Sequence, residues 1–286
     1  MVLAADIGGS HITSAIIDTD KELILPGSVS RLPVDKSESA ENIIQAWSKC
    51  LKNSCQFRES LNLGIAMPGP FDYSEGICYL DKSQKYGDLH GLNVKTLLAD
   101  ELGIYSDNIR LANDAVCFLM GEIQHLKLES RSRVLGLTLG TGLGGAYYLD
   151  DKFIDAEIWK LPFKNGIAED YFSTRWFVKK AFDLTGHKYP GLNEILKSPG
   201  SEAVLKSIFL EFVENLTELL IIQTERYQFS HAVIGGNIAK AHVHFMDKLS
   251  RSLTQHQCDL NVQISSLGEE AALYGASLIA DSERME

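Results

Sequence analysis

Two glycine-rich stretches carry the residue types that are best suited to chemistry in this chain. The longer one, residues 134–149, reads VLGLTLGTGLGGAYYL and predicts a strand, a tight turn and a second strand. A hairpin turn needs one or two residues with positive φ, and four glycines exceed that need. A backbone this bare, beside the Thr141 hydroxyl, is typical of a loop that binds phosphate oxygens through its N–H groups. A flexible hairpin would explain this stretch, taken alone, equally well.

A second stretch, residues 2–18, follows the same plan. A short apolar strand leads to Asp6, a turn with Gly8, Gly9 and Ser10 follows, and a second apolar strand returns. Two such hairpins, one opening each half of the chain, indicate an internal duplication. This repetition favours phosphate binding over a plain hairpin at both places.

A third candidate is the pair Asn113–Asp114, at the predicted junction of a strand and a helix. A carboxylate in such a place can accept a proton from a hydroxyl group, and the helix dipole favours its ionised form. Asp is also a good helix cap and Asn a good turn residue. The junction alone therefore favours these structural roles.

The elements that would position these motifs alternate along the chain. Apolar spacing predicts a pair of strands over 22–32, single strands over 61–67, 109–112, 153–154, 230–236 and 262–265, and helices over 35–50, 93–102, 113–127, 170–184, 202–227, 239–255 and 269–280. Asp35 and Glu38 resemble a capping box for the first helix. The alternation predicts an α/β protein. We assign residues 1–112 and a C-terminal helix over about 269–286 to an N-terminal α/β domain, and residues 113–268 to a C-terminal one.

The composition of the 286 residues is that of an ordinary soluble protein, with 45% hydrophobic and 23% charged residues. The net charge of −11 argues against binding to nucleic acid or to anionic membranes, because both need a basic surface. We expect neither a signal peptide nor a membrane-spanning stretch. The five cysteines are scattered and form no CxxC pair, which fits reduced thiols in the cytoplasm.

Five motifs together resemble the ROK family of bacterial sugar kinases and repressors, and the resemblance runs essentially end to end. DIGGS from residue 6 and LGTGLGG from residue 139 are similar to the family's two phosphate motifs. GIAMPGPFD from residue 64 resembles its PGPVD signature, NDA from residue 113 its catalytic motif, and the pair Gly235–Gly236 its adenosine motif. The resemblance implies a two-domain actin-like ATPase fold, a duplication of a ribonuclease H-like unit with a central mixed sheet in each domain.

The resemblance also implies a role for individual residues. Asp114 would be the catalytic base and, with Asn113, Glu157 and Glu169, would bind the sugar, while Asp6 would order Mg²⁺, often through water. The phosphates of ATP would contact Gly8, Gly9, Ser10, Gly140, Thr141 and Gly142, and the adenosine would lie against Gly235 and Gly236. Simpler interpretations remain for the acidic residues: helix caps or turn formers for the aspartates, and solvated side chains for the two glutamates.

The chain departs from the family pattern where the family binds zinc. Residues 156–160 read AEIWK, so the usual histidine after Glu-Ile is missing, and so is the cysteine cluster. The segment 161–168 is short and leads into EDYFSTR, which resembles the stretch after that cluster. We therefore expect no structural zinc, with Trp159, Tyr171 or Phe172 packing this loop in place of a metal.

The resemblance favours an ATP- and Mg²⁺-dependent hexose kinase that phosphorylates glucose or an N-acetylhexosamine, at O6. The family's repressors carry an additional domain before the first strand, and because this chain begins at that strand, a kinase is the expectation. The alternative is a non-catalytic regulator that senses a sugar or a nucleotide. The expected partner is a small-molecule sugar, with neither nucleic acid nor membrane, and the family relationship implies a homodimer.

Overall fold

The structure is a computed structural model that describes residues 1–55, 62–81, 86–127 and 132–281. It divides into two units, Met1–Leu126 with Glu269–Glu286, and Lys127–Gly268. We expected the first division after residue 112, where a strand ends. In the structure the following helix stays with the first unit, because it packs against the helix that returns from the C-terminal part of the chain.

The first unit is built on a six-stranded mixed sheet. Its strands are β1 (Val2–Ile7), β2 (His11–Asp18), β3 (Leu23–Ile24), β4 (Ser30–Pro33), β5 (Leu63–Met67) and β8 (Ile109–Asn113). The order is β3-β2-β1-β5-β8, and β4 also pairs with β2. The β1–β2 pair is antiparallel, whereas β1–β5 and β5–β8 are parallel. The strand predicted over 61–67 begins at Leu63, and Leu61 lies outside the described residues.

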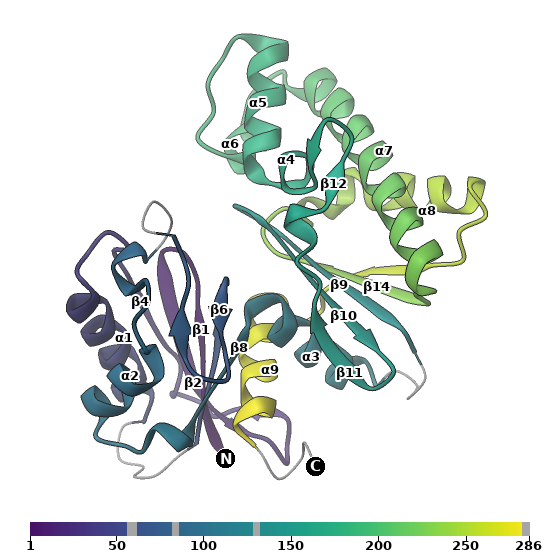
Figure 1. The fold of residues 1–286 in the computed structure, drawn as a ribbon. Helices are drawn as coiled ribbons and strands as arrows, with labels where there is room; N and C mark the ends of the chain where they lie inside the picture. Colours follow the sequence, from purple (N-terminus) through teal and green to yellow (C-terminus); the bar gives the residue numbers. More distant parts are fainter. Residues whose placement is uncertain (56–61, 82–85, 128–131, 282–286) are drawn as a thin grey trace. The chain divides into compact units, whose positions relative to one another are not determined.

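Helices cover both faces of this sheet (Figure 1). They are α1 (Ala40–Cys55) and α2 (Val94–Leu102) on one face, and α3 (Asp114–Leu126) and α9 (Ala271–Ala280) on the other. Because successive side chains of a strand point to opposite faces, Leu3 and Ala5 belong to the α1 and α2 core, while Val2 and Ala4 belong to the α9 core. Smaller elements are β6 (Phe71–Asp72), β7 (Ile77–Cys78), η1 (Gly87–Leu89) and η2 (Ser106–Asn108).

The helix α1 begins at Ala40, five residues later than predicted. The carboxylate of Asp35 accepts hydrogen bonds from the N–H and hydroxyl groups of Ser37, at 2.9 and 2.6 Å, and so forms a turn of its own. The hydroxyl of Ser39 accepts the N–H of Asn42 at 3.3 Å. The predicted capping box was therefore wrong, and Ser39 performs the capping.

The helix α9 approaches its neighbours at backbone distance. A Cβ atom built on Gly275 would lie 1.8 Å from the carbonyl oxygen of Cys117 in α3. A Cβ atom built on Gly64 in β5 would lie 1.8 Å from the carbonyl oxygen of Ala276 in α9. Only glycine permits both approaches, which fixes α9 between α3 and the sheet.

The second unit repeats the strand plan of the first. Its sheet contains β9 (Val134–Leu139), β10 (Leu143–Leu149), β11 (Lys152–Asp155), β14 (His231–Gly235) and β15 (Asn261–Ile264), in the order β11-β10-β9-β14-β15. An antiparallel hairpin, β9–β10, is followed by two parallel pairs, β9–β14 and β14–β15. These directions match those of β2-β1-β5-β8, so the duplication inferred from the glycine motifs extends to the sheets.

One large apolar core lies between the second sheet and its helices (Figure 1). The helices are α4 (Glu169–Phe172), α5 (Thr174–Thr185), α6 (Leu192–Lys197), α7 (Glu202–Tyr227) and α8 (Met246–Gln255), with η3 (Ile158–Lys160), η4 (Ala239–His244) and the hairpin β12 (Pro162–Phe163) and β13 (Gly166–Ile167). The short helix η5 (Gly268–Glu270) lies at the boundary of the two units. The broad apolar face of α7 is buried in this core, as predicted. Two predicted helices are interrupted, one at Ser173 and one at Phe245, where the backbone leaves helical dihedral angles.

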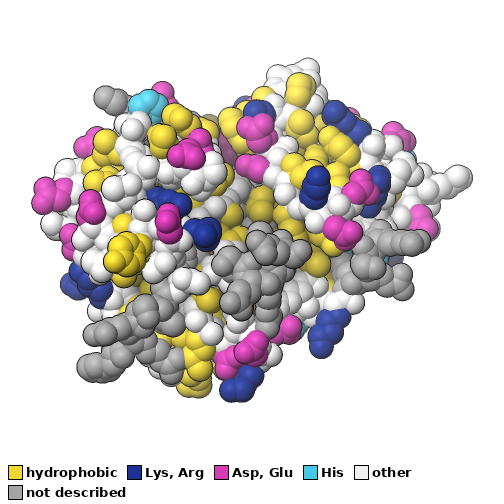
Figure 2. All heavy atoms as spheres, turned by 60° about the horizontal axis from the view of Figure 1, so that its bottom comes forward, with side chains coloured by type: hydrophobic (Ala, Val, Ile, Leu, Met, Phe, Trp, Pro, Cys, Tyr) yellow, Lys and Arg dark blue, Asp and Glu magenta, His cyan; other side chains and the backbone are white. Residues whose placement is uncertain are grey.

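The described surface mixes charges of both signs. On the face drawn in Figure 2, lysine and arginine side chains lie mostly singly among aspartates and glutamates. No described helix combines the length and apolar character needed to cross a membrane.

Candidate functional site

The first glycine turn follows directly from β1. The N–H of Gly8 donates to the carbonyl of His11 at 2.9 Å, and Gly9 and Ser10 complete the turn, with Ser10 exposed. The hydroxyl of Tyr86, a buried residue, donates to the carbonyl of Gly8 at 2.5 Å. Burial raises the pKa of Tyr86 to about 12, so Tyr86 remains a neutral donor. Tyr86 is 78 residues from Gly8 in sequence, and no local pattern pointed to it.

Asp6 lies in β1 just before this turn, in an acidic environment. Its pKa is raised to about 7 by burial and by the nearby Asp114 carboxylate, while Arg31 lowers it and Glu269 raises it. The guanidinium of Arg31 forms an ion pair with Glu269 at 2.6 Å, which offsets part of its effect on Asp6. A cation beside Asp6 and Asp114 would favour the ionised form of both.

Asn113 and Asp114 lie where β8 passes into α3. The Oδ1 atom of Asn113 accepts the N–H groups of Ala115 and Val116, at 2.9 and 3.2 Å, and Oδ1 of Asp114 accepts that of Ala115 at 2.8 Å. Both side chains therefore cap the helix. The capping role does not exclude a chemical one, because it fixes the carboxylate at a helix N-terminus, where the ionised form is stabilised.

The loop after β5 is tied to Asn113. The hydroxyl of Tyr73 donates to the carbonyl of Met67 at 3.0 Å and accepts from Nδ2 of Asn113 at 3.3 Å. A Cβ atom on Gly69 would lie 3.0 Å from the Tyr73 hydroxyl, so a larger residue there would require the Tyr73 side chain to shift slightly. Tyr73 was not predicted as a site residue, although it follows the PGPFD signature directly.

Strand register explains why these groups gather. In the parallel ladder Asp6 pairs with Ala66, and Met67 in turn pairs with Asn113. The carboxyl ends of neighbouring parallel strands meet at one edge of a sheet, which is where ligands of open α/β sheets bind. The first unit therefore brings Asp6, Asn113 and Asp114 to one edge, next to the first glycine turn.

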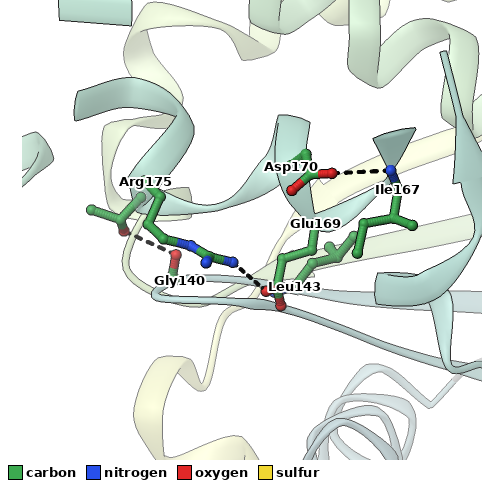
Figure 3. Close-up of polar contacts among 7 residues, drawn as sticks. Gly140, Leu143, Ile167, Glu169, Asp170 and Arg175 are labelled. Carbon is green, nitrogen blue, oxygen red and sulfur yellow. Dashed lines mark hydrogen bonds and ion pairs between the residues drawn. The ribbon is translucent and has the colours of Figure 1, made fainter. Parts of the chain in front are cut away.

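The second glycine turn is held by the start of α5 (Figure 3). Within the turn, the N–H of Gly140 donates to the carbonyl of Gly142 at 3.0 Å. The carbonyl of Gly140 accepts both the N–H and the hydroxyl of Thr174, at 2.8 and 2.9 Å. Thr141, at the tip, is exposed. Thr174 therefore holds the turn through the carbonyl of Gly140. The N–H groups at the tip of the turn, those of Thr141 and Gly142, are not used in this contact.

Glu169 lies against this turn (Figure 3). Its Oε2 atom accepts the N–H of Leu143 at 3.2 Å, and its Oε1 atom pairs with the guanidinium of Arg175 at 2.6 Å. A Cβ atom on Gly142 would lie 2.7 Å from Oε2, so the glycine makes room for the carboxylate. Thus Glu169, predicted to bind sugar, also belongs to the second glycine turn, and Arg175 is a charged neighbour that was not predicted.

Glu157, the other predicted sugar ligand, is exposed and has φ of 42°, in the left-handed region. Its N–H donates to Oδ1 of Asp155 at 2.9 Å, and its carboxylate pairs with Lys160 at 2.5 Å. Burial raises the pKa of Asp155. Left-handed backbone at a residue other than glycine is costly, and such residues occur in turns as well as at functional sites.

The segment between the two glutamates is a short hairpin, β12–β13, packed by aromatic rings. Phe163 lies 5.2 Å from the ring of Tyr171 and 5.4 Å from that of Phe172, whereas Trp159 is 40% exposed. Lys164, at the hairpin tip, binds Asn215 and Glu218 of α7. Two of the three aromatic residues expected to pack this loop therefore do so.

In the part of the chain that the structure describes, no group of three or more histidine, cysteine or acidic side chains could hold a metal ion. That the protein binds no structural zinc remains a prediction. Metal analysis of the purified protein should find no stoichiometric zinc, and a chelator should leave its melting temperature unchanged. One tightly bound zinc per chain would contradict it.

Gly235 and Gly236 follow the neighbouring strand of the same sheet. Gly235 pairs with Thr138 at the end of β9, so the predicted adenosine motif lies beside the start of the second glycine turn. Gly236 has φ of 84°, and a Cβ atom there would lie 2.4 Å from the carbonyl oxygen of Leu139. Glycine is therefore required by the packing at this position, whatever else it contacts.

Comparison with known proteins bears on the family and the fold of the chain. An N-acetyl-D-glucosamine kinase of Pectobacterium atrosepticum is 25% identical over 190 residues, which cover 66% of this chain and 57% of that protein. The chain thus spans little more than half the length of this curated relative. A ROK family glucokinase of Streptomyces griseus, solved with glucose and AMPPNP, has a TM-score of 0.76 at 20% identity, covering 100% of this chain and 99% of its own.

A further solved structure is an inorganic polyphosphate/ATP-glucomannokinase of Arthrobacter sp. strain KM, with a TM-score of 0.73 at 19% identity, covering 99% of this chain and 98% of that one. These likenesses show the fold, which is that of the actin-like ATPases. The model of the ROK family matches residues 2–157, more than half of the sequence. With its two glycine turns, its duplicated sheets and this match, the chain belongs to the ROK family.

Proposed function

We propose that the protein is an ATP- and Mg²⁺-dependent sugar kinase that phosphorylates a hexose, glucose or an N-acetylhexosamine, at O6. The observation that carries this proposal is the gathering of Asp6, Asn113 and Asp114 at the carboxyl ends of β1 and β8, beside a phosphate-type turn. The kinase activities of the relatives support it, as does the solved glucokinase with bound glucose and AMPPNP. We expect a homodimer in the cytoplasm.

Asp114 is the proposed general base. As the O6 atom of the sugar attacks the terminal phosphorus, the new O–P bond forms, the bond to the leaving ADP oxygen breaks, and the O6 proton passes to the Asp114 carboxylate. The N–H of Ala115 at the start of α3 donates to that carboxylate and orients it, and the helix dipole favours a negative charge there. Asn113 would donate to a sugar hydroxyl through its Nδ2 atom, because its Oδ1 atom already caps α3.

The acidic edge of the first unit fits a magnesium ion. When bound, Mg²⁺ would neutralise the phosphate charge that develops during transfer. Mg²⁺ usually keeps several waters and takes one or two protein carboxylates besides the phosphates, so a full cage of protein ligands is not required. Asp6 would hold it, often through water. Burial raises the pKa of Asp6 most, the charge of Asp114 raises it further, and a bound cation would offset both effects.

Glu157 and Glu169 are the proposed sugar ligands of the second unit. Replacing Glu157 by glutamine should weaken sugar binding by about 10-fold or more, because a hydrogen bond to a charged group is worth roughly 1.5–3 kcal/mol. Affinity for AMPPNP should stay unchanged, because Glu157 contacts Asp155 and Lys160 and not the glycine turn. Calorimetric titration of both ligands measures this, with Glu214→Gln at an exposed position of α7 as control. Unchanged sugar binding would place the sugar in another segment.

The second candidate is a non-catalytic sensor of sugar or nucleotide. One observation favours it: the Glu169 carboxylate already binds Arg175 and the N–H of Leu143. A sugar hydroxyl would have to displace one of these groups or share the carboxylate with it. A coupled assay for ADP release with MgATP and a panel of glucose, mannose, N-acetylglucosamine and N-acetylmannosamine separates the two. The kinase requires sugar-dependent ADP release with at least one of them. Sugar binding by calorimetry without any ADP release would establish the sensor.

A further inference from the structure

Arg175 lies at the second glycine turn without being part of it (Figure 3). Its side chain leaves the first turn of α5 and ends beside Glu169, with Gly140 and Leu143 on either side of the guanidinium in this view. The Arg175 side chain is 70% exposed and the Glu169 side chain 24% exposed. Among the described residues, Arg175 forms one ion pair, which joins its Nη2 atom to Oε1 of Glu169 at 2.6 Å.

Glu169 brings a negative charge to the turn. Its Oε2 atom binds the N–H of Leu143, one residue past the glycine turn. A phosphate at this turn would be repelled by the carboxylate unless a positive charge lay between them or beside them. In the structure Arg175 provides that charge, paired with the Glu169 oxygen that does not bind the turn.

The Arg175 guanidinium has capacity beyond this ion pair. It carries five N–H donors in a planar fork and matches phosphate oxygens bidentately. An exposed ion pair contributes little to stability, so sharing the guanidinium with a ligand costs little. The carbonyl of Gly140 is fixed by Thr174, and no partner is found in the described structure for the N–H groups of Thr141 and Gly142. A phosphate at the turn tip and the guanidinium would therefore be near neighbours.

We propose that Arg175 is a phosphate-binding residue: its guanidinium bridges the Glu169 carboxylate and the terminal phosphate of the donor bound at residues 140–142. This rests on the proposed function, since it assumes that the turn binds the phosphates of ATP. Arg175 then has two effects, direct hydrogen bonding and cancellation of the Glu169 charge. The recognised chemistry is that of a polyphosphate chain, with or without a nucleoside.

The test compares binding of three probes by calorimetry: AMPPNP with Mg²⁺, sodium tripolyphosphate with Mg²⁺, and adenosine. Arg175→Met should weaken AMPPNP and tripolyphosphate by about 10- to 100-fold, because charge-assisted hydrogen bonds and charge cancellation are lost together. Adenosine should bind as before. The affinities of Arg175→Lys for AMPPNP and tripolyphosphate should lie between those of the wild type and Arg175→Met, because lysine keeps the charge but not the planar fork. Glu169→Gln should not weaken tripolyphosphate, because it removes a repelling charge.

The matched control is Lys179→Met, which removes one positive charge from an exposed position one helical turn further along α5. It should leave all three affinities unchanged. If Arg175→Met binds tripolyphosphate as tightly as the wild type, or weakens adenosine equally, the inference is overturned while the proposed kinase stands. If the wild-type protein binds neither AMPPNP nor tripolyphosphate, the proposed ATP-dependent function fails as well.

Discussion

Replacing Asp114 by asparagine is expected to slow sugar phosphorylation by about 10²–10⁴-fold while leaving the fold intact. The amide cannot accept the proton of the sugar hydroxyl. Its oxygen can still accept the N–H of Ala115, the bond that Asp114 makes at 2.8 Å, and Asn caps helices as well as Asp does. The variant therefore separates the chemical role from the capping role. The measurements are kcat in the coupled assay, sugar affinity by calorimetry and the melting temperature.

The control for this substitution is Asp35→Asn. Asp35 also accepts a backbone N–H through its carboxylate, at 2.9 Å from Ser37, but it lies in an exposed turn before α1. It should leave kcat unchanged. If Asp114→Asn turns sugar over at the wild-type rate, Asp114 is only a helix cap, and another group must take the proton.

The second large effect is expected at Gly275. Alanine there would place its Cβ atom 1.8 Å from the carbonyl oxygen of Cys117, so α9 and α3 must separate. Overpacking of this kind costs about 3 kcal/mol, and the better helix propensity of alanine returns about 1 kcal/mol, leaving a net loss of about 2 kcal/mol. Because the chain has two units, hydrogen exchange resolved by peptide is the suitable measurement. Protection should fall in α3, α9 and β5, and stay unchanged in α7.

The control for this variant is Leu278→Met, at a half-buried position of α9. Leucine and methionine have similar volumes and similar helix propensities, so this change should leave exchange nearly unchanged. Equal protection of Gly275→Ala and the wild type would mean that the two backbones have room that the contact distance does not indicate.

Much of the first unit could be predicted because its signals are local. The alternating cores of β1, the cap of α2 at Asn93 and the glycine after it are all determined by residues close in sequence. The start of α1 was predicted too early because Asp35 satisfies its own turn, a competition that a capping pattern does not reveal. The breaks at Ser173 and Phe245 arise from packing of distant segments. At Ser173, the next residue, Thr174, binds the carbonyl of Gly140, which is far away in sequence.

The candidate site shows the same limit. Glycines and aspartates of the motifs could be named because turn geometry and strand ends require them. The side chains that contact these residues could not be named from the sequence. Tyr86, Tyr73 and Arg175 bind residues with which they share no sequence pattern. The position of Glu169 depends on where α4 lies, and a family motif gives its identity but not its hydrogen-bond partners.

The position of α9 in the chain has a consequence for biosynthesis. This helix completes the core that contains Val2, Ala4 and Ala66, yet residues 271–280 are made after the whole of the second unit. On the ribosome, the second unit can therefore fold while one face of the first sheet still lacks part of its cover, which reverses the common order of N-terminal folding first. The early strands β1 and β5 must stay soluble through that interval, exposing a face made largely of alanine and other small residues.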